Sequence, residues 1–286
     1  MGVIIIQIRR PLLIILMFVV AISFIITNNT KNDEELNDKI ITIQGVVKGK
    51  IEKKRYNQYK VGVFLINDYT KNKNLKIGQK VNITGKFKSL DKMKYDDFDY
   101  GRYIKSTGYK GIVYINNYKI IDKNKLYSLI GEIKFYISKT YRYLYKKNSD
   151  FINSILLAEV ENLTEEQKEI FTRTGTSHVI SISGLHTGIL CVIISFLLRG
   201  INKLYKLLIL SIFITLYCIM VGASPSIIRS IAFVMIFYLS IFIDRKKDGI
   251  SALSLIGIIL IMNNPYVIYN VSFQLSFLAT LSILIV

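Results

Sequence analysis

The chain has 286 residues, with 38 Lys and Arg against 20 Asp and Glu, a formal net charge of +18 and only two cysteines. Residues 1–27 and 178–286 are dominated by Ile, Leu, Val and Phe, whereas residues 31–125 contain many Lys and Asn. This contrast argues against one soluble domain, and the positive charge favours an anionic partner, either nucleic acid or lipid headgroups. Both cysteines fall in apolar segments, which excludes a disulfide framework in the polar part.

The apolar N-terminal run Pro11–Thr27 carries no charge over 17 residues and follows Arg9 and Arg10. As a helix, with a rise of about 1.5 Å per residue, this run is long enough to cross a thin hydrocarbon core. A cleaved signal peptide is the alternative, but Asn and Thr follow the run where a small-residue cleavage site would be needed. We therefore expect residues 1–30 to form an uncleaved transmembrane anchor.

Residues 31–125 are expected to form a small all-β barrel domain. Runs of β-branched and aromatic residues, bounded by turn signals, predict strands at residues 40–47, 59–66, 80–87, 109–115 and 118–121. About five short strands in this length of chain favour a barrel of the OB type.

Residues 96–103 interleave aromatic and charged side chains within this domain. Such a mixture suits single-stranded DNA, because bases stack on aromatic rings and cations neutralise phosphates. The simpler interpretation is that these rings pack against the edge of the barrel. The candidate DNA contacts are Phe98, Tyr100, Arg102 and Tyr103.

Residues 126–177 are predicted to form amphipathic or interfacial helices. Residues 126–147 carry Tyr, Ile and Lys without a long uncharged run, which is typical of a helix lying at a membrane interface. Thr164 and Gln167 have the spacing of a capping box and predict a short helix. That helix is expected to end near Arg173, with Gly175 as its C-terminal stop.

Residues 178–286 contain about five apolar runs typical of membrane spans, at 179–198, 207–221, 227–243, 250–262 and 266–286. The short loops 199–206 and 244–248 each hold three basic residues, whereas the turns 222–226 and 263–265 are uncharged. Basic short loops lie on the cytoplasmic side, so we expect a cytoplasmic N-terminus and an extracellular barrel domain. The predicted fold class is a multi-pass α-helical membrane protein with an inserted extracellular OB-like barrel.

Polar residues interrupt the apolar runs at three places, and polar groups at membrane depth are expected to face a bundle interior or a wet pathway. The first place holds the chain's two histidines and includes Gly184 and Gly188, a spacing that lets helices approach closely. The second is an arginine, and the third is a pair of amides one helical turn apart. The candidate pathway residues are His178, Ser181, Ser183, Gly184, His186, Arg229, Asn270 and Gln274.

Three interpretations of the histidine stretch stay open: a tightly packed helix, a polar pathway lining, and an intramembrane hydrolase that uses Ser183 and His186. No third orienting group can be named for a hydrolase. Two histidines without a nearby carboxylate fall short of the ligands that a zinc site needs, so no metal site is predicted.

Four segments, in order, resemble the ComEC competence family. They are Phe98-Asp99-Tyr100 with Tyr103, Gly108-Tyr109 and Gly111; Phe171, Gly175 and His178 leading into Ser181-Ile182-Ser183-Gly184-Leu185-His186; Gly222-Ala223-Ser224-Pro225-Ser226 with Arg229; and Asn264-Pro265 followed by Val271-Ser272-Phe273-Gln274-Leu275-Ser276-Phe277. This resemblance implies a membrane channel that moves one DNA strand into the cytoplasm during natural transformation. It also implies a DNA-delivery receptor outside the cell and a helicase-like motor inside.

The chain departs from the family in several respects. Family members usually continue into a metallo-β-lactamase-like domain, proposed to be a nuclease, that is not found in this sequence. We therefore expect no catalytic residue, no metal and no cofactor, and we expect the sequence to be a fragment or a truncated gene product. The family often has Asp where Asn270 stands and more than one leading span, and the outer-domain disulfide of some members cannot form here.

The leading hypothesis from the sequence is a channel component for uptake of single-stranded DNA, with the lipid bilayer as its other partner. The alternatives are the Ser–His hydrolase and a non-catalytic envelope scaffold that binds oligosaccharide through the barrel. The sequence does not fix the oligomeric state and leaves a homo-oligomer open.

Overall fold

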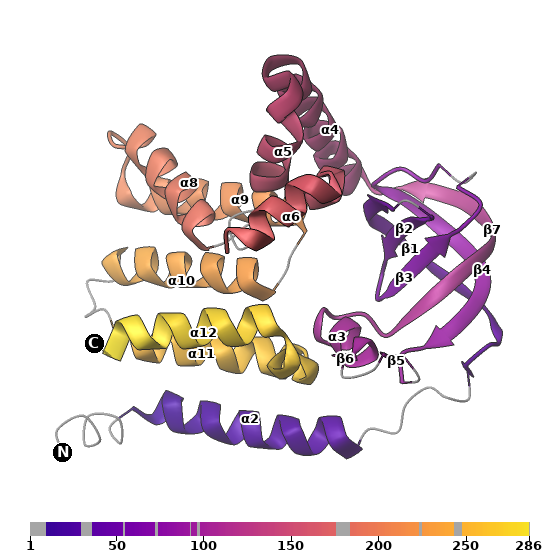
Figure 1. The fold of residues 1–286 in the computed structure, drawn as a ribbon. Coiled ribbons are helices and arrows are strands. Elements are labelled where there is room, and N and C mark those ends of the chain that lie inside the picture. The colour runs from indigo at the N-terminus through magenta and orange to yellow at the C-terminus, as the bar shows by residue number, and fades with distance from the viewer. Residues whose placement is uncertain are drawn as a thin grey trace.

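The computed structural model describes residues 10–29, 36–53, 55–71, 74–91, 93–95, 98–175, 184–222, 225–242 and 248–285. Figure 1 shows a β-barrel beyond one end of a set of helices that run side by side. Helix α2 (Pro11–Asn29) begins and helix α12 (Val271–Ile285) ends at the opposite end of those helices.

Five strands close the barrel: β1 (Ile40–Glu52), β2 (Asn57–Val61), β3 (Phe64–Asp68), β4 (Gln79–Ser89) and β7 (Gly111–Lys123). Their order around the barrel is β1-β2-β3-β7-β4, and β3 and β7 pair in parallel whereas the other neighbours are antiparallel. Alternate residues of each strand point inward. The interior is filled by an apolar cluster that includes Val47, Tyr59, Ile66, Ile83 and Val113. The small five-stranded barrel predicted from the sequence is confirmed.

Two of the predicted strand boundaries are wrong. The run 59–66 is not one strand, because Gly62 adopts a φ of 58° and turns the chain between β2 and β3. Glycine accepts this left-handed conformation without a steric penalty, and the turn makes β2 and β3 a tight hairpin. Conversely, the runs 109–115 and 118–121 form the single strand β7. A bulge at Asn116 shifts the pairing with β4, and the shift disturbs the period-two pattern in the sequence.

The connection from β4 to β7 folds onto the outside of the barrel. It contains the small hairpin of β5 (Lys94–Tyr95) and β6 (Phe98–Asp99), followed by helix α3 (Tyr100–Ser106). The Asp99 carboxylate caps α3 by accepting a hydrogen bond from the backbone N–H of Arg102 at 2.8 Å. Beneath α3 lies a second apolar cluster formed by Leu65, Leu90, Met93, Ile104 and Ile112. Burial at this cluster raises the pKa of Tyr109 to about 12, so its hydroxyl stays protonated.

Three helices follow the barrel: α4 (Lys125–Tyr145), α5 (Ser149–Leu157) and α6 (Glu165–Arg173), with short 3₁₀ turns η2 (Lys146–Asn148) and η3 (Val160–Asn162) between them. The predicted capping box of α6 is confirmed, because Thr164 and Gln167 bond reciprocally. A helix near residues 126–147 is confirmed as α4, but α5 was not predicted. Lys146, with a φ of 43°, lies outside the helical conformation and ends α4 before α5 begins. In Figure 1, α4 runs across the direction of the long helices.

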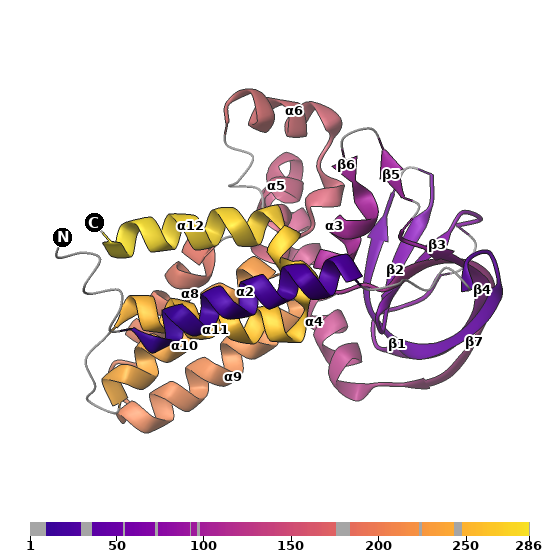
Figure 2. The same cartoon turned by 90° about the horizontal axis from the view of Figure 1, so that it is seen from below.

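The other helices in the described part of the chain are α2 (Pro11–Asn29), α8 (Gly184–Leu197), α9 (Lys203–Val221), α10 (Pro225–Phe242), α11 (Gly249–Asn263) and α12 (Val271–Ile285). The predicted fifth span, 266–286, is not a single helix, because the 3₁₀ segment η4 (Pro265–Tyr269) precedes α12. Figures 1 and 2 both show α2, α11 and α12 side by side. Within the described residues, two helices, α2 and α9, are long and apolar enough to cross a membrane, and shorter apolar stretches lie in α8, α10, α11 and α12.

Replacing Gly101 with Ala tests the packing of α3. A methyl group at this position collides with the carbonyl of Leu90, and overpacking of this kind costs about 1–3 kcal/mol. We expect a lower melting temperature for the full chain in detergent, measured by circular dichroism. Gly200→Ala is the matched control, because no described atom lies within 4 Å of its added carbon. Equal melting temperatures for the two variants would contradict the packing of α3 against Leu90.

Candidate functional site

The segment η4 joins the barrel to the helices through two asparagines, one on each side of it. The Asn264 amide donates to the backbone carbonyls of Lys105 at 2.9 Å and Ser106 at 3.3 Å, both in α3. The Asn270 amide donates to the Ser106 hydroxyl at 3.2 Å. Each asparagine also uses its side-chain oxygen to cap the segment that follows it, η4 or α12. The amide N–H groups of the two asparagines therefore hold α3 of the barrel domain, and their side-chain oxygens hold the starts of η4 and α12.

Helix α2 contacts the other side of η4. The Ser23 hydroxyl donates to the carbonyl of Pro265 at 2.7 Å, and the hydroxyls of Thr27 and Tyr269 are 3.0 Å apart. The Phe24 ring meets the Tyr269 ring edge-on, with centroids 5.7 Å apart. The N-terminal helix therefore belongs to the same junction.

Two cations of α3 lie over the aromatic rings of η4. The Arg102 guanidinium is 4.5 Å from the centre of the Tyr269 ring, and the Lys105 ammonium is 5.2 Å from the centre of the Tyr266 ring. Cations over ring faces are held by the negative quadrupole of the ring. The rings thus position positive charge at the boundary between the barrel and the helices.

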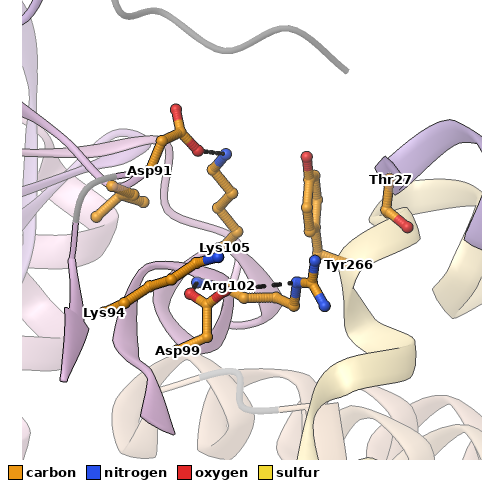
Figure 3. Close-up of a pocket in the computed structure, with 8 residues that line it drawn as sticks. Thr27, Asp91, Lys94, Asp99, Arg102, Lys105 and Tyr266 are labelled. Atoms are coloured by element: carbon orange, nitrogen blue, oxygen red, sulfur yellow. Dashed lines mark hydrogen bonds and ion pairs between the residues drawn. The ribbon is translucent and has the colours of Figure 1, made fainter. Parts of the chain in front are cut away.

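A polar cavity of about 130 Å³ opens at this boundary (Figure 3) and is called the junction cavity here. Lys105 and Asp91 are 2.6 Å apart with mostly buried side chains, and Arg102 lies 3.8 Å from Asp99. Three cationic side chains and two carboxylates line the cavity, so positive charge is in excess. Convergent charged groups in a cavity are typical of a binding site. The lining residues are Thr27, Leu90, Asp91, Lys94, Asp99, Arg102, Lys105 and Tyr266.

The four candidate DNA contacts of the barrel domain lie together on β6 and α3, beside this cavity. Phe98 and Tyr103 are exposed, with ring centroids 5.9 Å apart. The ring centroids of Tyr100 and Tyr103 are 6.2 Å apart. Tyr100 also packs against the apolar cluster beneath α3, as the edge-packing interpretation predicted. Arg102 lines the junction cavity itself.

The other lining residues were missed by the sequence analysis, because they come from three distant segments of the chain. Lys105 is the one that a sequence signal could have indicated. It lies three residues after Arg102, and this spacing places both side chains on one face of α3.

Of the predicted pathway residues, His178, Ser181 and Ser183 lie outside the described residues. Gly184 begins α8, and His186 is half-buried in the first turns of that helix. Among the described residues no atom lies within 4 Å of a carbon added at Gly188. The close helix approach predicted from the spacing of Gly184 and Gly188 is therefore not found at the second glycine.

Each of the other three predicted pathway residues forms at least one hydrogen bond with η4 or α12. The Arg229 guanidinium, in α10, donates to the carbonyl of Ser276 at 2.8 Å and to the Thr280 hydroxyl. The Gln274 amide donates to the carbonyl of Ile268 at 2.7 Å, and Asn270 is buried at the junction. These bonds give each residue a packing role, and the pathway role stays a prediction.

Replacing Arg229 with Ala tests its contact with α12. A hydrogen bond from a charged donor contributes about 1.5–3 kcal/mol, so we expect the full chain in detergent to unfold at a lower temperature. Arg199→Ala, in the loop after α8, is the control and is expected to leave thermal unfolding unchanged. Wild-type stability of the Arg229 variant would contradict a role in holding α12.

The chain is similar to known proteins over part of its length. ComE operon protein 3 from Bacillus subtilis (strain 168) is 26% identical over 165 residues, which are 57% of this chain and 21% of that protein. An uncharacterized protein from Aquifex aeolicus (strain VF5) is 31% identical over 126 residues, which are 44% of this chain and 30% of that protein. The chain therefore matches less than a third of the length of either relative.

Among solved structures, the aspartyl tRNA synthetase from Entamoeba histolytica matches 66% of this chain and 44% of its own chain, with 11% identity and a TM-score of 0.21. That likeness is too weak to support an argument. The family model described as Competence protein matches residues 155–286, which extend from α5 through α12 and include η4 with both junction asparagines. Residues 155–286 of this chain, a little under half of its length, are therefore similar to the competence protein family.

Proposed function

We propose that the chain is a membrane channel component for uptake of single-stranded DNA in natural transformation. One observation carries the proposal: the competence-family segment, 155–286, forms the helices against which the basic barrel domain is docked. The role is transport rather than catalysis. A DNA-delivery receptor outside the cell and a helicase-like motor inside it are the partners that we propose from the family resemblance.

The exposed surface of the helices supports a place in the lipid bilayer. Large apolar side chains on α2, α8 and α9 are between 61% and 74% exposed; they are Met17, Phe18, Phe196, Leu197 and Ile212. A soluble protein rarely exposes so much apolar surface, whereas lipid covers it without cost. Helix α4 carries exposed Phe135 and Tyr136 beside Lys139, and we propose that it lies along the membrane interface.

The chemistry of the two ends of the helices supports the orientation. The uncharged turn with Asn264 contacts the barrel domain. At the other end, Arg10 pairs with Asp248 at 3.6 Å, and the loop 199–206 carries three basic residues. Because basic short loops remain in the cytoplasm, we propose that the barrel domain is extracellular and that the N-terminus is cytoplasmic.

The junction cavity would be the place where a strand passes from the barrel domain to the helices. A DNA strand carries one negative charge per phosphate, and cations at the mouth of a pathway raise its local concentration. Lys94, Arg102 and Lys105 supply such cations on the extracellular side. The five-stranded barrel with a crossover order is also compatible with an OB-type domain, a fold that binds oligonucleotides.

Labelling of single cysteines tests the orientation. The background variant has Cys191 and Cys218 replaced by Ser. In it, Lys119→Cys, on the exposed face of β7, is expected to react with a membrane-impermeant maleimide in cells whose outer envelope has been removed and whose cytoplasmic membrane is intact. A cysteine at Lys203, at the start of α9, is expected to react only after the membrane is permeabilised. Reaction of the Lys203→Cys variant in intact cells would contradict the proposed topology.

Uptake of labelled DNA tests the junction cavity. Cells that carry the double substitution Lys94→Gln and Lys105→Gln are expected to take up DNA more slowly by about 100-fold or more, because each of the two lost charge-assisted contacts contributes about 1.5–3 kcal/mol and about 1.4 kcal/mol is a factor of ten. Lys105→Arg keeps the charge and is expected to retain uptake, and Lys119→Gln on the barrel wall is the matched control. Wild-type uptake by the double variant would remove the junction cavity from the pathway.

A further inference from the structure

Three tyrosines form a row on the outside of the barrel and share no residue with the junction cavity. The ring centroids of Tyr56 and Tyr69 are 4.8 Å apart with an angle of 31° between the rings. Those of Tyr69 and Tyr114 are 5.9 Å apart with an angle of 37°. We call these three residues the tyrosine ladder. The distances are within the range of stacked and tilted aromatic pairs.

The hairpin register explains why these residues meet. Tyr56 immediately precedes β2, and Tyr69 immediately follows β3. Asn57 and Asp68 are the last cross-strand partners of β2 and β3, so Tyr56 and Tyr69, one residue further along each chain segment, lie opposite each other. Tyr114 comes from β7, whose parallel pairing with β3 places it beside Asn67. The ladder therefore crosses three neighbouring strands.

The central ring is presented by an ordered turn. Asp68 is fully buried, and its carboxylate accepts hydrogen bonds from the backbone N–H of Thr70 at 3.1 Å and from the Thr70 hydroxyl at 2.6 Å. This closed turn holds Tyr69 between the two residues, yet the Tyr69 side chain is 56% exposed. An exposed ring on an ordered turn loses little freedom when a ligand covers it.

Positive charge flanks the ladder. The Lys53 ammonium lies 5.1 Å from the centre of the Tyr56 ring and 3.1 Å from its hydroxyl. Arg55 is exposed in the same turn between β1 and β2. The acid nearest to Lys53 in the sequence is Glu52, whose carboxylate is 2.6 Å from the Lys50 ammonium. Asp68, which precedes Tyr69, is fully buried.

We propose that the tyrosine ladder is a platform on which nucleobases of single-stranded DNA stack, with Lys53 and Arg55 contacting the phosphates. The inference deepens the proposed function and rests on it. Rings beside cations match a polymer that has flat bases and an anionic backbone. A neutral oligosaccharide could use the rings but has no need of the cations. The ladder also lies by the first inter-strand loop and the β2–β3 face, where OB barrels bind ligands.

The first experiment measures binding of a single-stranded oligodeoxynucleotide to the full chain in lipid nanodiscs by fluorescence anisotropy. Tyr69→Ala is expected to weaken binding about 5- to 100-fold, the range for loss of one stacked base. Tyr69→Phe is expected to bind like the wild type. An oligomer of abasic deoxyribose phosphate is expected to bind both proteins equally, because it offers phosphates without bases. Tyr143→Ala, at an exposed ring of α4, is the matched control.

A second variant reports stacking directly. The sequence contains no tryptophan, so Tyr69→Trp carries a single indole. We expect its fluorescence to be quenched by the base-containing oligomer and not by the abasic one. Lys53→Ala is expected to reduce the slope of log affinity against log salt by about 0.7, the value for one lost contact with a single-stranded phosphate.

Three outcomes would overturn the proposal. The first is equal affinity of the Tyr69→Ala variant and the wild type for DNA, and the second is equal quenching of the Tyr69→Trp indole by both oligomers. The third is a Tyr69→Ala variant that loses affinity for a neutral oligosaccharide but keeps its affinity for DNA. Failure of the ladder is separable from failure of the proposed function. If Tyr69→Ala binds DNA normally while cells with the altered junction cavity lose uptake, the ladder is excluded and the transport role stands. If cells lacking the chain take up DNA normally, the transport role is excluded regardless of what the ladder binds.

Discussion

The arrangement of the two parts of the molecule depends on the amides of Asn264 and Asn270. Each side chain faces two ways, because its N–H groups bond α3 of the barrel domain and its oxygen caps a helical segment. One such bond contributes only about 1 kcal/mol, but Asn270 is buried, and an unpaired amide there would lose its hydration without compensation. An aspartate at position 270, as the family resemblance suggests for other members, could still accept a hydrogen bond from the Phe273 N–H, and one from the Ser106 hydroxyl if that hydroxyl turned away from the Tyr103 carbonyl. Position 270 therefore needs a short side chain with an acceptor, whereas position 264 needs an amide, because its N–H groups donate to two backbone carbonyls.

The junction between the barrel domain and the helices determines where the cations of the junction cavity lie. Charged groups are costly at membrane depth, and among the described residues 207–242 only Arg229 is charged, with its guanidinium bonded to α12. The cations of the junction cavity instead lie on α3 and β5, outside the long helices. Their position depends on η4, because Tyr266 and Tyr269 lie beneath Lys105 and Arg102. In the proposed transport role, phosphates therefore meet fixed positive charge before they reach the apolar helices.

The sequence predicted those features that depend on neighbouring residues. Alternating strands indicated the barrel, and Thr164 with Gln167 indicated the start of α6. The break at Pro265 was visible as a turn, but the second break at Asn270 was not, because it is stabilised by Ser106, more than 160 residues earlier. The junction cavity was hidden for the same reason. The tyrosine ladder was hidden by one misplaced boundary, because a single strand across residues 59–66 leaves Tyr56 and Tyr69 without a common partner.

The two surfaces proposed for DNA are connected through one apolar cluster. Tyr114 of the ladder packs against the cluster that contains Leu65 of β3, Ile112 of β7 and Ile104 of α3. Ile104 lies between Arg102 and Lys105, which line the junction cavity. A well-packed cluster does not deform gradually, so the distance between the ladder and the cavity is fixed by the barrel fold rather than by a flexible linker. In the proposed role, a strand whose bases stack on the ladder therefore meets the cations of the junction cavity at a distance that the barrel fold sets.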